Sequence, residues 1–264
     1  MDIVLLLKAA LLGLVEGLTE FLPVSSTGHL IIVGDLIDFT GDNAKVFEVA
    51  IQLGAVLGVA WDRRARLVRL ATGLRGATER QFALNLLVAF LPAAVVGLLL
   101  HHQIKAYLFS PVTVALALIV GGVAILVIER LPLRPHVDNL DAVSTRAALK
   151  IGLAQILSLF PGVSRAAATI MGGLVAGLNR TTATEFSFFL AMPVMVAATG
   201  RELFGNFDHM RTEDLAAFAV GLVVSFVTAV VVVRLFVRYV SQHHFTVFAW
   251  YRIALGSIVL WYFC

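Results

Sequence analysis

Cysteine and charge are both scarce in this chain of 264 residues. The single cysteine, Cys264, excludes an intrachain disulfide and a cysteine-based zinc site. Charged residues make up 14% of the sequence, whereas soluble domains carry roughly a quarter. Hydrophobic residues make up 59%, and the mean hydropathy is +0.93. This composition excludes an ordinary water-soluble domain and indicates a membrane protein.

Two sequence patterns are also missing. The apolar stretches are continuous rather than alternating, which argues against a transmembrane β-barrel. The net charge is +3, but no basic stripe interleaved with aromatic residues appears, so nucleic acid is not an expected partner. The sequence therefore predicts an all-α polytopic membrane protein that is embedded in the lipid bilayer.

Six apolar segments are long enough to cross about 30 Å of hydrocarbon. They are residues 46–61, 82–100, 112–129, 185–204, 215–239 and 246–263. Two further apolar regions, residues 3–38 and 147–179, are interrupted by proline and polar residues. Each region predicts two short helices that meet at a polar turn, as in a re-entrant hairpin. Non-helical backbone at membrane depth has to be buried in protein or line a cavity.

The chain is similar to itself at an offset of 139 residues. The matching positions include Gly13 with Gly152, Phe21 with Phe160, and Ser25 with Ser164. In both halves a broken region precedes three spans. We therefore predict one membrane domain made of two repeats, residues 1–130 and 142–264, with a linker over residues 131–141.

The charges of two equivalent loops predict how the repeats are oriented. Residues 62–80 are rich in arginine and net positive, whereas residues 201–214 are net negative. Positively charged loops stay in the cytoplasm, so the two loops should lie on opposite sides of the membrane. The second repeat is then inverted relative to the first, and both termini lie outside.

The first broken region gathers polar side chains inside apolar sequence. They are Glu16, Glu20, Ser25, Ser26, Thr27 and His29. Glu16 and Glu20 are four residues apart, so they share one face of a helix. Pro23 ends that helix. Ionisable groups at membrane depth are costly and therefore indicate function.

The second broken region supplies groups that bind anions. Its candidate residues are Gln155, Gly162, Ser164, Arg165 and Thr169. An arginine presents a fork of donors that suits phosphate. The run over residues 161–165 precedes a helix, whose N-terminal N–H groups and dipole also attract an anion. Inverted repeats bring two such regions together near the membrane midplane.

Together these groups suit phosphoryl chemistry. Glu16 and Glu20 are candidate ligands of a divalent cation, Mg²⁺ or Ca²⁺, which neutralises phosphate oxygens. Ser26 or His29 can attack phosphorus with a neighbouring base. We favour Ser26 with His29 as proton shuttle, because three residues separate them and one helical turn brings them together. Direct attack by His29 and attack by metal-bound water remain alternatives.

Structural interpretations compete with these roles. Glu16 and Glu20 can form a carboxylate pair near the outer surface, and a lone histidine such as His29 is commonly structural. Arg165 can extend its head to the membrane boundary. Ser25 and Ser164 suit helix N-caps better than nucleophiles.

Three motifs resemble one family across the chain. Residues 16–29, 161–165 and 185–193 are similar to bacterial undecaprenyl-diphosphate phosphatases of the bacitracin-resistance type. The resemblance implies two inverted repeats, each with a re-entrant pair. It implies hydrolysis of undecaprenyl diphosphate to undecaprenyl phosphate and inorganic phosphate, which recycles the lipid carrier of peptidoglycan synthesis. It also implies a place in the bacterial inner membrane. The loop charges, which put both termini and the first hairpin outside, predict an active site open to the periplasmic side.

The resemblance also implies residue roles. Glu16 and Glu20 hold the metal or activate water, Ser26 and His29 are nucleophile or acid–base candidates, and Arg165 binds phosphate. One departure stands out: the family continues Ser-Arg-Ser-Gly, whereas this chain has alanine at both positions after Arg165. The missing hydroxyl is then either dispensable here or replaced by that of Thr169.

A polyprenyl-phosphate transporter is the competing function, because broken helices in inverted repeats are also typical of transporters. Such a protein would bind the lipid headgroup without cleaving it. The dense polar run over residues 25–29 exceeds what simple binding needs and favours the phosphatase. The large apolar surface leaves lipid contact and a homodimer contact as equal alternatives.

Overall fold

The computed structural model describes residues 3–107, 110–206 and 215–263. Apart from turns, connecting segments and two short 3-10 helices, the described chain is α-helical, which confirms the predicted all-α class. In chain order the elements are α1 (Ile3–Thr19), α2 (Ser26–Leu36), α3 (Asp42–Asp62), α4 (Arg64–Thr72), α5 (Ala77–Tyr107), α6 (Pro111–Arg130), η1 (Leu140–Ala142), α7 (Thr145–Gln155), η2 (Ile156–Leu159), α8 (Arg165–Val175), α9 (Arg180–Asn206), α10 (Leu215–Val240) and α11 (Thr246–Phe263).

Five of the described helices are long and apolar enough to cross a membrane: α5, α6, α9, α10 and α11. They contain five of the six predicted spans. The sixth, residues 46–61, lies in α3, which has 21 residues and packs along α10 and α9 but is not among the five. The chain is therefore a multi-pass membrane protein.

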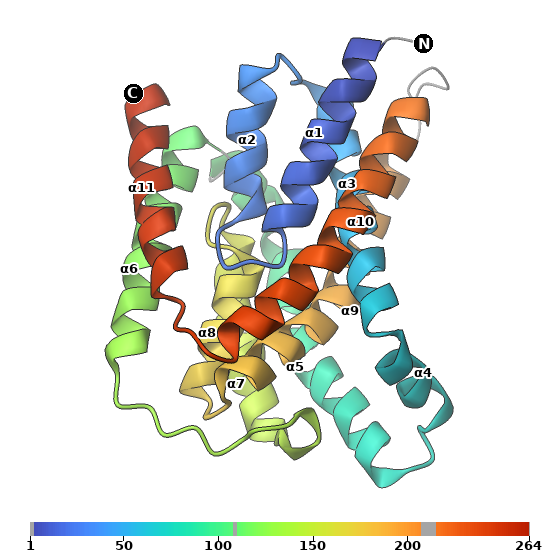
Figure 1. Cartoon of the computed structure of the whole chain (residues 1–264), viewed down its shortest axis with the longest axis vertical. Coiled ribbons are helices and arrows are strands. Elements are labelled where there is room, and N and C mark those ends of the chain that lie inside the picture. Colours follow the sequence, from blue (N-terminus) through green and yellow to red (C-terminus); the bar gives the residue numbers. More distant parts are fainter. Residues whose placement is uncertain (1–2, 108–109, 207–214, 264) are drawn as a thin grey trace.

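The two broken regions form two hairpins of short helices. Figure 1 shows α1 and α2 at the end of the molecule that carries both termini, and α7 and α8 toward the opposite end. The turns that join the helices of each pair point toward the middle of the molecule. We call these turns the first tip, residues 20–26, and the second tip, residues 160–165.

Two observations support the predicted duplication. Helices α2 and α8 both have 11 residues, and their first residues, Ser26 and Arg165, are 139 positions apart (165 − 26). The residues before them, Ser25 and Ser164, both adopt a φ of 71°. Non-glycine residues avoid this region, and such strain persists only where the surrounding structure enforces it. The duplication stays a prediction that these equivalences favour.

The segment between the predicted repeats is ordered. It runs from the end of α6 to the start of α7, close to the predicted linker over residues 131–141. The backbone N–H groups of His136 and Val137 donate to the carbonyl of Gly177, at 2.9 and 3.1 Å. The segment is therefore fixed to the turn between α8 and α9.

Glycines let α1 approach α10 closely. A Cβ placed on Gly13 would lie 2.4 Å from the carbonyl oxygen of Gly221, and one on Gly17 would lie 2.6 Å from that of Ser225. Membrane helices pack through small residues in this way. Since Glu16 lies between these two glycines on α1, the close contact with α10 also fixes where its carboxylate lies.

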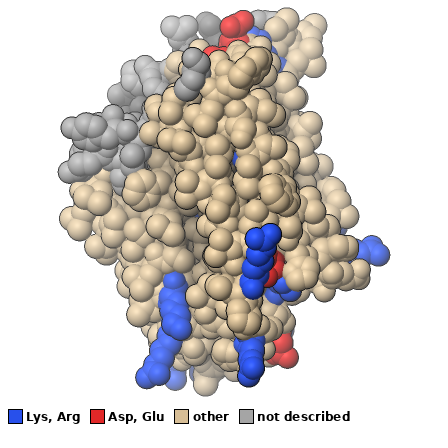
Figure 2. All heavy atoms as spheres, turned by 90° about the vertical axis from the view of Figure 1, so that its left-hand side faces the viewer, with Lys and Arg blue, Asp and Glu red and all other residues tan. Residues whose placement is uncertain are grey.

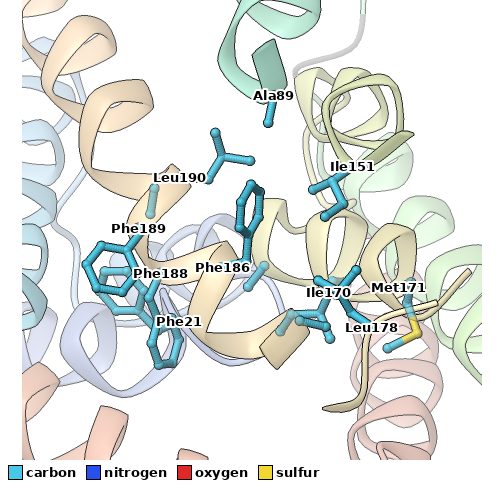
Figure 3. Close-up of a cluster of buried hydrophobic side chains, with 14 of the residues drawn as sticks. Phe21, Ala89, Ile151, Ile170, Met171, Leu178, Phe186, Phe188, Phe189 and Leu190 are labelled. Atoms are coloured by element: carbon cyan, nitrogen blue, oxygen red, sulfur yellow. The ribbon is translucent and has the colours of Figure 1, made fainter. Parts of the chain in front are cut away.

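Aromatic residues of α9 anchor the core and the first tip. Figure 3 shows Phe186 of this helix on the side of Ile151 and Ile170 of the second hairpin, and Phe188 and Phe189 on the other side, near Phe21. Phe21 of the first tip meets Phe188 edge to face, with ring centroids 5.6 Å apart. Burial of large aromatic rings is strongly stabilising. The packing therefore holds both hairpins against one central helix.

Ion pairs gather at the end opposite the termini. Arg63 donates to Glu185 at 2.7 Å, which gives a structural role to a glutamate of the third motif. Arg66 pairs with Glu79 at 3.0 Å. On the face shown in Figure 2, the Lys and Arg side chains likewise gather toward this end. The loop of residues 62–80 lies at this end (Figure 1), and its placement in the cytoplasm stays a prediction. Residues 207–214 of its counterpart lie outside the described residues.

Candidate active site

The two tips meet through a buried ion pair. Arg165, the first residue of α8, donates from Nη2 to Oε1 of Glu20 at 3.0 Å. The two side chains are only 9% and 10% exposed. The predicted meeting of the tips is therefore present, and it joins the carboxylate of one motif directly to the guanidinium of another.

Ser26 also points toward Glu20. Helix α1 ends at Thr19, and the chain turns back through Pro23 to start α2 at Ser26. This turn lets Ser26 Oγ donate to Glu20 Oε2 at 2.5 Å. Ser25 occupies the N-cap position of α2, but its side chain makes no capping hydrogen bond. The first N–H groups of α2 are consequently not satisfied by Ser25.

The second tip is tied to α9. Ser164 caps α8 by accepting a hydrogen bond from the backbone N–H of Ala167 at 3.2 Å, as predicted for an N-cap. Thr169 donates to the carbonyl of Arg165 at 2.9 Å and shares a hydrogen bond with the hydroxyl of Ser187 at 2.7 Å. Arg165 Nη1 donates to the carbonyl of Ser187 at 3.3 Å. These contacts fix the direction of the guanidinium.

Three buried polar atoms in or next to the tips lack a hydrogen-bond partner within the described residues. They are both carboxylate oxygens of Glu16 and the Nε–H of Arg165. Burying such groups unpaired is costly, so native proteins rarely do so without a reason. An unpaired carboxyl group suits the binding of a metal cation, and an unpaired guanidinium N–H suits the binding of a phosphate anion.

The carboxylates fit a divalent cation that shares its coordination with a substrate. Glu20 lies beside Glu16, and the other charges that act on Glu16 are those of Glu48 and Arg165. Across the described chain, no group of three or more His, Cys, Asp or Glu side chains forms a complete metal site. Mg²⁺ commonly binds one or two carboxylates and completes its shell with phosphate oxygens and water. Glu16 and Glu20 suit that incomplete arrangement.

His29 is engaged away from Ser26. Its Nδ1 lies 2.7 Å from the carbonyl oxygen of Ser25, and its Nε2 lies 2.5 Å from the hydroxyl of Tyr251 on α11. A carbonyl only accepts, so in the neutral ring the proton is on Nδ1, and Nε2 accepts from Tyr251. The hydrogen bonds of the described residues thus pair Ser26 with Glu20 rather than with His29.

The remaining candidates have mainly structural contacts. Gln155 is fully buried, and its Nε2 donates to the carbonyl of Ala89 on α5 at 3.4 Å, which joins α7 to α5. Thr27 is half-buried in the first turn of α2. Gly162 has a φ of 90° and accepts a hydrogen bond from Arg252 at 3.1 Å.

Helix α11 supplies two residues that sequence reasoning missed. Tyr251 reaches His29, and Arg252 is fully buried and reaches both tips. Both lie in a segment that was predicted only to span the membrane. The usable signal was the arginine itself, because a charged residue within a transmembrane helix marks a functional or structural polar contact.

Fold and site together define a class: a multi-pass helical membrane protein whose interior polar site is built from the tips of two short-helix hairpins. The particular family follows from comparison with known proteins. The family model described as bacitracin resistance protein BacA matches residues 9–258. The chain belongs to this family.

Three proteins that are similar to this chain over almost their whole length have the same name. A protein of Methylobacillus flagellatus called undecaprenyl-diphosphatase is 58% identical over 268 residues and is aligned over 100% of both chains. A Nitrosomonas eutropha protein of the same name is 56% identical, with 98% of this chain and 95% of its own covered. One from Ectopseudomonas mendocina is 51% identical, again with 98% and 95% covered.

Proposed function

We propose that this protein hydrolyses undecaprenyl diphosphate to undecaprenyl phosphate and inorganic phosphate. One observation carries the proposal: the buried Glu16 carboxyl, next to the first tip, and the buried Arg165 Nε–H, in the second tip, both lack partners within the described residues. A diphosphate with its counter-cation would satisfy both groups. The names of the similar proteins support the same substrate.

Binding of the diphosphate relies on fixed donors. Arg165 is oriented by Glu20 and by the carbonyl of Ser187, which leaves its Nε–H for a phosphate oxygen. Helices α2 and α8 both begin at the tips, so their N-terminal dipoles add to the attraction. Donors that are already oriented stabilise a transition state without reorganising.

Ser26 is the nucleophile we favour, with Glu20 as its base. The Ser26 hydroxyl already donates to Glu20 at 2.5 Å, within the reach that proton transfer requires. Ser26 Oγ attacks the terminal phosphorus, its proton passes to Glu20, and the bond from that phosphorus to the bridging oxygen breaks. Undecaprenyl phosphate leaves with the bonding electrons. Water then hydrolyses the phosphoserine and releases inorganic phosphate.

Glu16 and Glu20 would hold the divalent cation, Mg²⁺ or Ca²⁺. When bound, this cation supplies neutralisation of negative charge on the diphosphate oxygens. Glu16 suits this role because neither of its oxygens is used elsewhere within the described residues. Arg165 balances the charge of Glu20, which reduces the electrostatic repulsion between the two carboxylates.

We place the protein in the bacterial inner membrane with the first hairpin opening to the periplasmic side. Support comes from the arginine-rich end of the molecule, which lies opposite the end that carries both termini and the α1–α2 hairpin (Figure 1). Positive loops stay in the cytoplasm. An outward-facing site suits recycling of the lipid carrier after polymer transfer, and thereby bacitracin resistance.

The covalent route predicts a phosphoenzyme on Ser26. Substrate labelled at the terminal phosphorus, mixed with purified protein and quenched within one turnover, should leave label on Ser26. Ser26→Ala should remove both the label and most of the turnover, while Ser257→Ala, on the exposed face of α11, should change neither. Label on His29 would assign attack to the histidine. No label anywhere, with full turnover by Ser26→Ala, would assign it to water.

Phosphate release tests the function itself. Protein purified in detergent should release inorganic phosphate from C15 and C55 prenyl diphosphates when a divalent cation is present. Prenyl monophosphates should release none. A protein that binds prenyl phosphates and moves them across vesicles, but releases no phosphate, would be the transporter instead.

A further inference from the structure

Arg252 lies buried within an apolar helix and has no carboxylate among the hydrogen-bond partners that the described residues provide. It is 0% exposed. Its acceptors are five backbone carbonyls, those of Pro23 (3.3 Å), Val163 (2.9 Å), Gly162 (3.1 Å), Ala117 (3.2 Å) and Leu118 (3.3 Å).

This arrangement uses the whole guanidinium. Arginine has five N–H donors in a planar fork, and Arg252 makes five hydrogen bonds. A buried charge is costly unless its donors are all satisfied. Lysine would bring three donors from one point and leave some carbonyls without partners. The chemistry therefore requires arginine rather than any cation.

The bonded carbonyls identify what Arg252 holds. Nη1 donates both to Pro23 in the first tip and to Val163 in the second, so a single nitrogen joins the two hairpins. Non-helical backbone leaves carbonyls that the helices cannot satisfy, and they need partners from elsewhere. Pro23 precedes Ser26 by three residues, and Val163 precedes Arg165 by two.

We propose that Arg252 is a positioning residue that sets the spacing of the two tips and so aligns Ser26 with the phosphate that Arg165 binds. The inference rests on the proposed diphosphate hydrolysis. Arg252 reaches the tip backbones and leaves the Ser26, Glu20 and Arg165 side chains to the reaction. Loss of its hydrogen bonds should let the tips separate while the surrounding helices stay packed.

Gly121 on α6 offers a second way to disturb the same contact. A Cβ placed there would lie 2.2 Å from Nη2 of Arg252 and 2.8 Å from its Cζ. Gly121→Ala should therefore push the guanidinium off its carbonyls while Arg252 itself is retained. Gly200→Ala is the matched control, because no described atom beyond its chain neighbours and its own helical backbone lies within 4 Å of a Cβ at that position.

Hydrogen exchange tests the tip spacing without reference to activity. In Arg252→Lys and in Gly121→Ala, backbone amides of residues 21–30 and 160–168 should exchange about 10-fold faster, because loss of the Arg252 hydrogen bonds to the tip carbonyls makes local opening of the tips easier. Exchange in α3 and α10 should not change. The control Arg234→Lys alters an arginine that is 60% exposed and pairs with Asp62, and it should match wild type throughout.

Kinetics tests whether the spacing serves the reaction. Both variants should lower kcat at least about 10-fold with KM within about threefold, since alignment rather than binding is lost. In a Ser26→Ala background, Arg252→Lys should cause little further loss. A residue that only supports the fold would instead add its full loss in both backgrounds.

The exchange rates of the tips and the kcat values of the variants together accept or reject the proposal. Faster exchange at both tips together with lower kcat supports the proposal. Unchanged tip exchange, or exchange that rises across the whole chain, overturns it. If Arg252→Lys does not fold, Gly121→Ala decides by the same criteria. Wild-type protein that releases no phosphate would reject the proposed function, while the exchange data would still accept or reject the contact between the tips.

Discussion

Arg165→Lys is expected to lower kcat/KM for a prenyl diphosphate by about 100- to 1,000-fold, the loss typical of one oriented transition-state donor. Lysine keeps the charge, but its three donors radiate from one nitrogen and cannot reproduce the spacing of the Arg165 fork, which donates to Glu20 and to the Ser187 carbonyl and leaves Nε–H for a phosphate oxygen. Steady-state phosphate release by the purified variant measures the loss.

The control for Arg165→Lys is Arg63→Lys. Arg63, in the turn between α3 and α4, also forms an ion pair, with Glu185 of α9 at 2.7 Å, but it lies outside the tips. It should keep near wild-type turnover, and both variants should remain folded in a thermal unfolding scan. Near-normal activity of Arg165→Lys would remove the arginine from phosphate binding and leave it a structural partner of Glu20.

Glu16→Gln is expected to lower turnover by about 100-fold or more, within the range of general acid–base and electrostatic contributions. The amide keeps the shape of the carboxylate but removes the charge that a cation needs. The variant should also lose the rise in thermal midpoint that Mg²⁺ or Ca²⁺ gives to wild type, because binding to the folded state stabilises it. Without cation it should be at least as stable as wild type, since a buried unpaired carboxylate opposes folding.

Glu20→Gln should reduce turnover as severely, but it should also destabilise the protein. Its carboxylate accepts from both Ser26 and Arg165, so the substitution leaves a buried guanidinium without its anion. Glu79→Gln, which breaks the Arg66 ion pair at the other end, is the control that should keep activity. Full activity of the wild-type protein in excess chelator would contradict the requirement for a cation. It would not contradict the requirement for both carboxylates.

The hairpins could be predicted because their signal is local. Proline and a polar run interrupt sequence that otherwise reads as membrane helix, and backbone that leaves a helix at depth has few permitted forms. The 139-residue offset then predicted equivalent elements, and α2 and α8 begin at that spacing. The same strained φ at Ser25 and Ser164 could not be predicted, because strain depends on the packing around it.

The partners within the site could not be predicted from spacing. The contact between Arg165 and Glu20 joins residues 145 positions apart. Ser26 and His29 are one helical turn apart, yet Ser26 is the first residue of α2 and turns back toward the end of α1. The hydroxyl of Tyr251, on α11, forms a hydrogen bond with Nε2 of His29. Contacts between distant segments therefore determine these partners, and they override the pairing of Ser26 with His29 that sequence spacing predicts.

Arg252 shows a further limit of pattern reading. Its segment is apolar enough to cross a membrane, so hydropathy alone hides one arginine within it. The physical need that explains this residue lies elsewhere, in carbonyls of two non-helical turns and of α6. A search for charged residues inside predicted spans would have identified Arg252. It would not have identified the carbonyls to which Arg252 donates.

We propose that one diphosphate site forms where the two tips meet. The most direct measurement is an experimental structure of the protein with a methylene-bridged prenyl bisphosphonate and a divalent cation. We predict phosphorus density in contact with Arg165 and Ser26, with the cation at the Glu16 carboxylate. Phosphorus density elsewhere, such as the cavity lined by Arg180, His243 and His244 at the end of α10, would contradict the account.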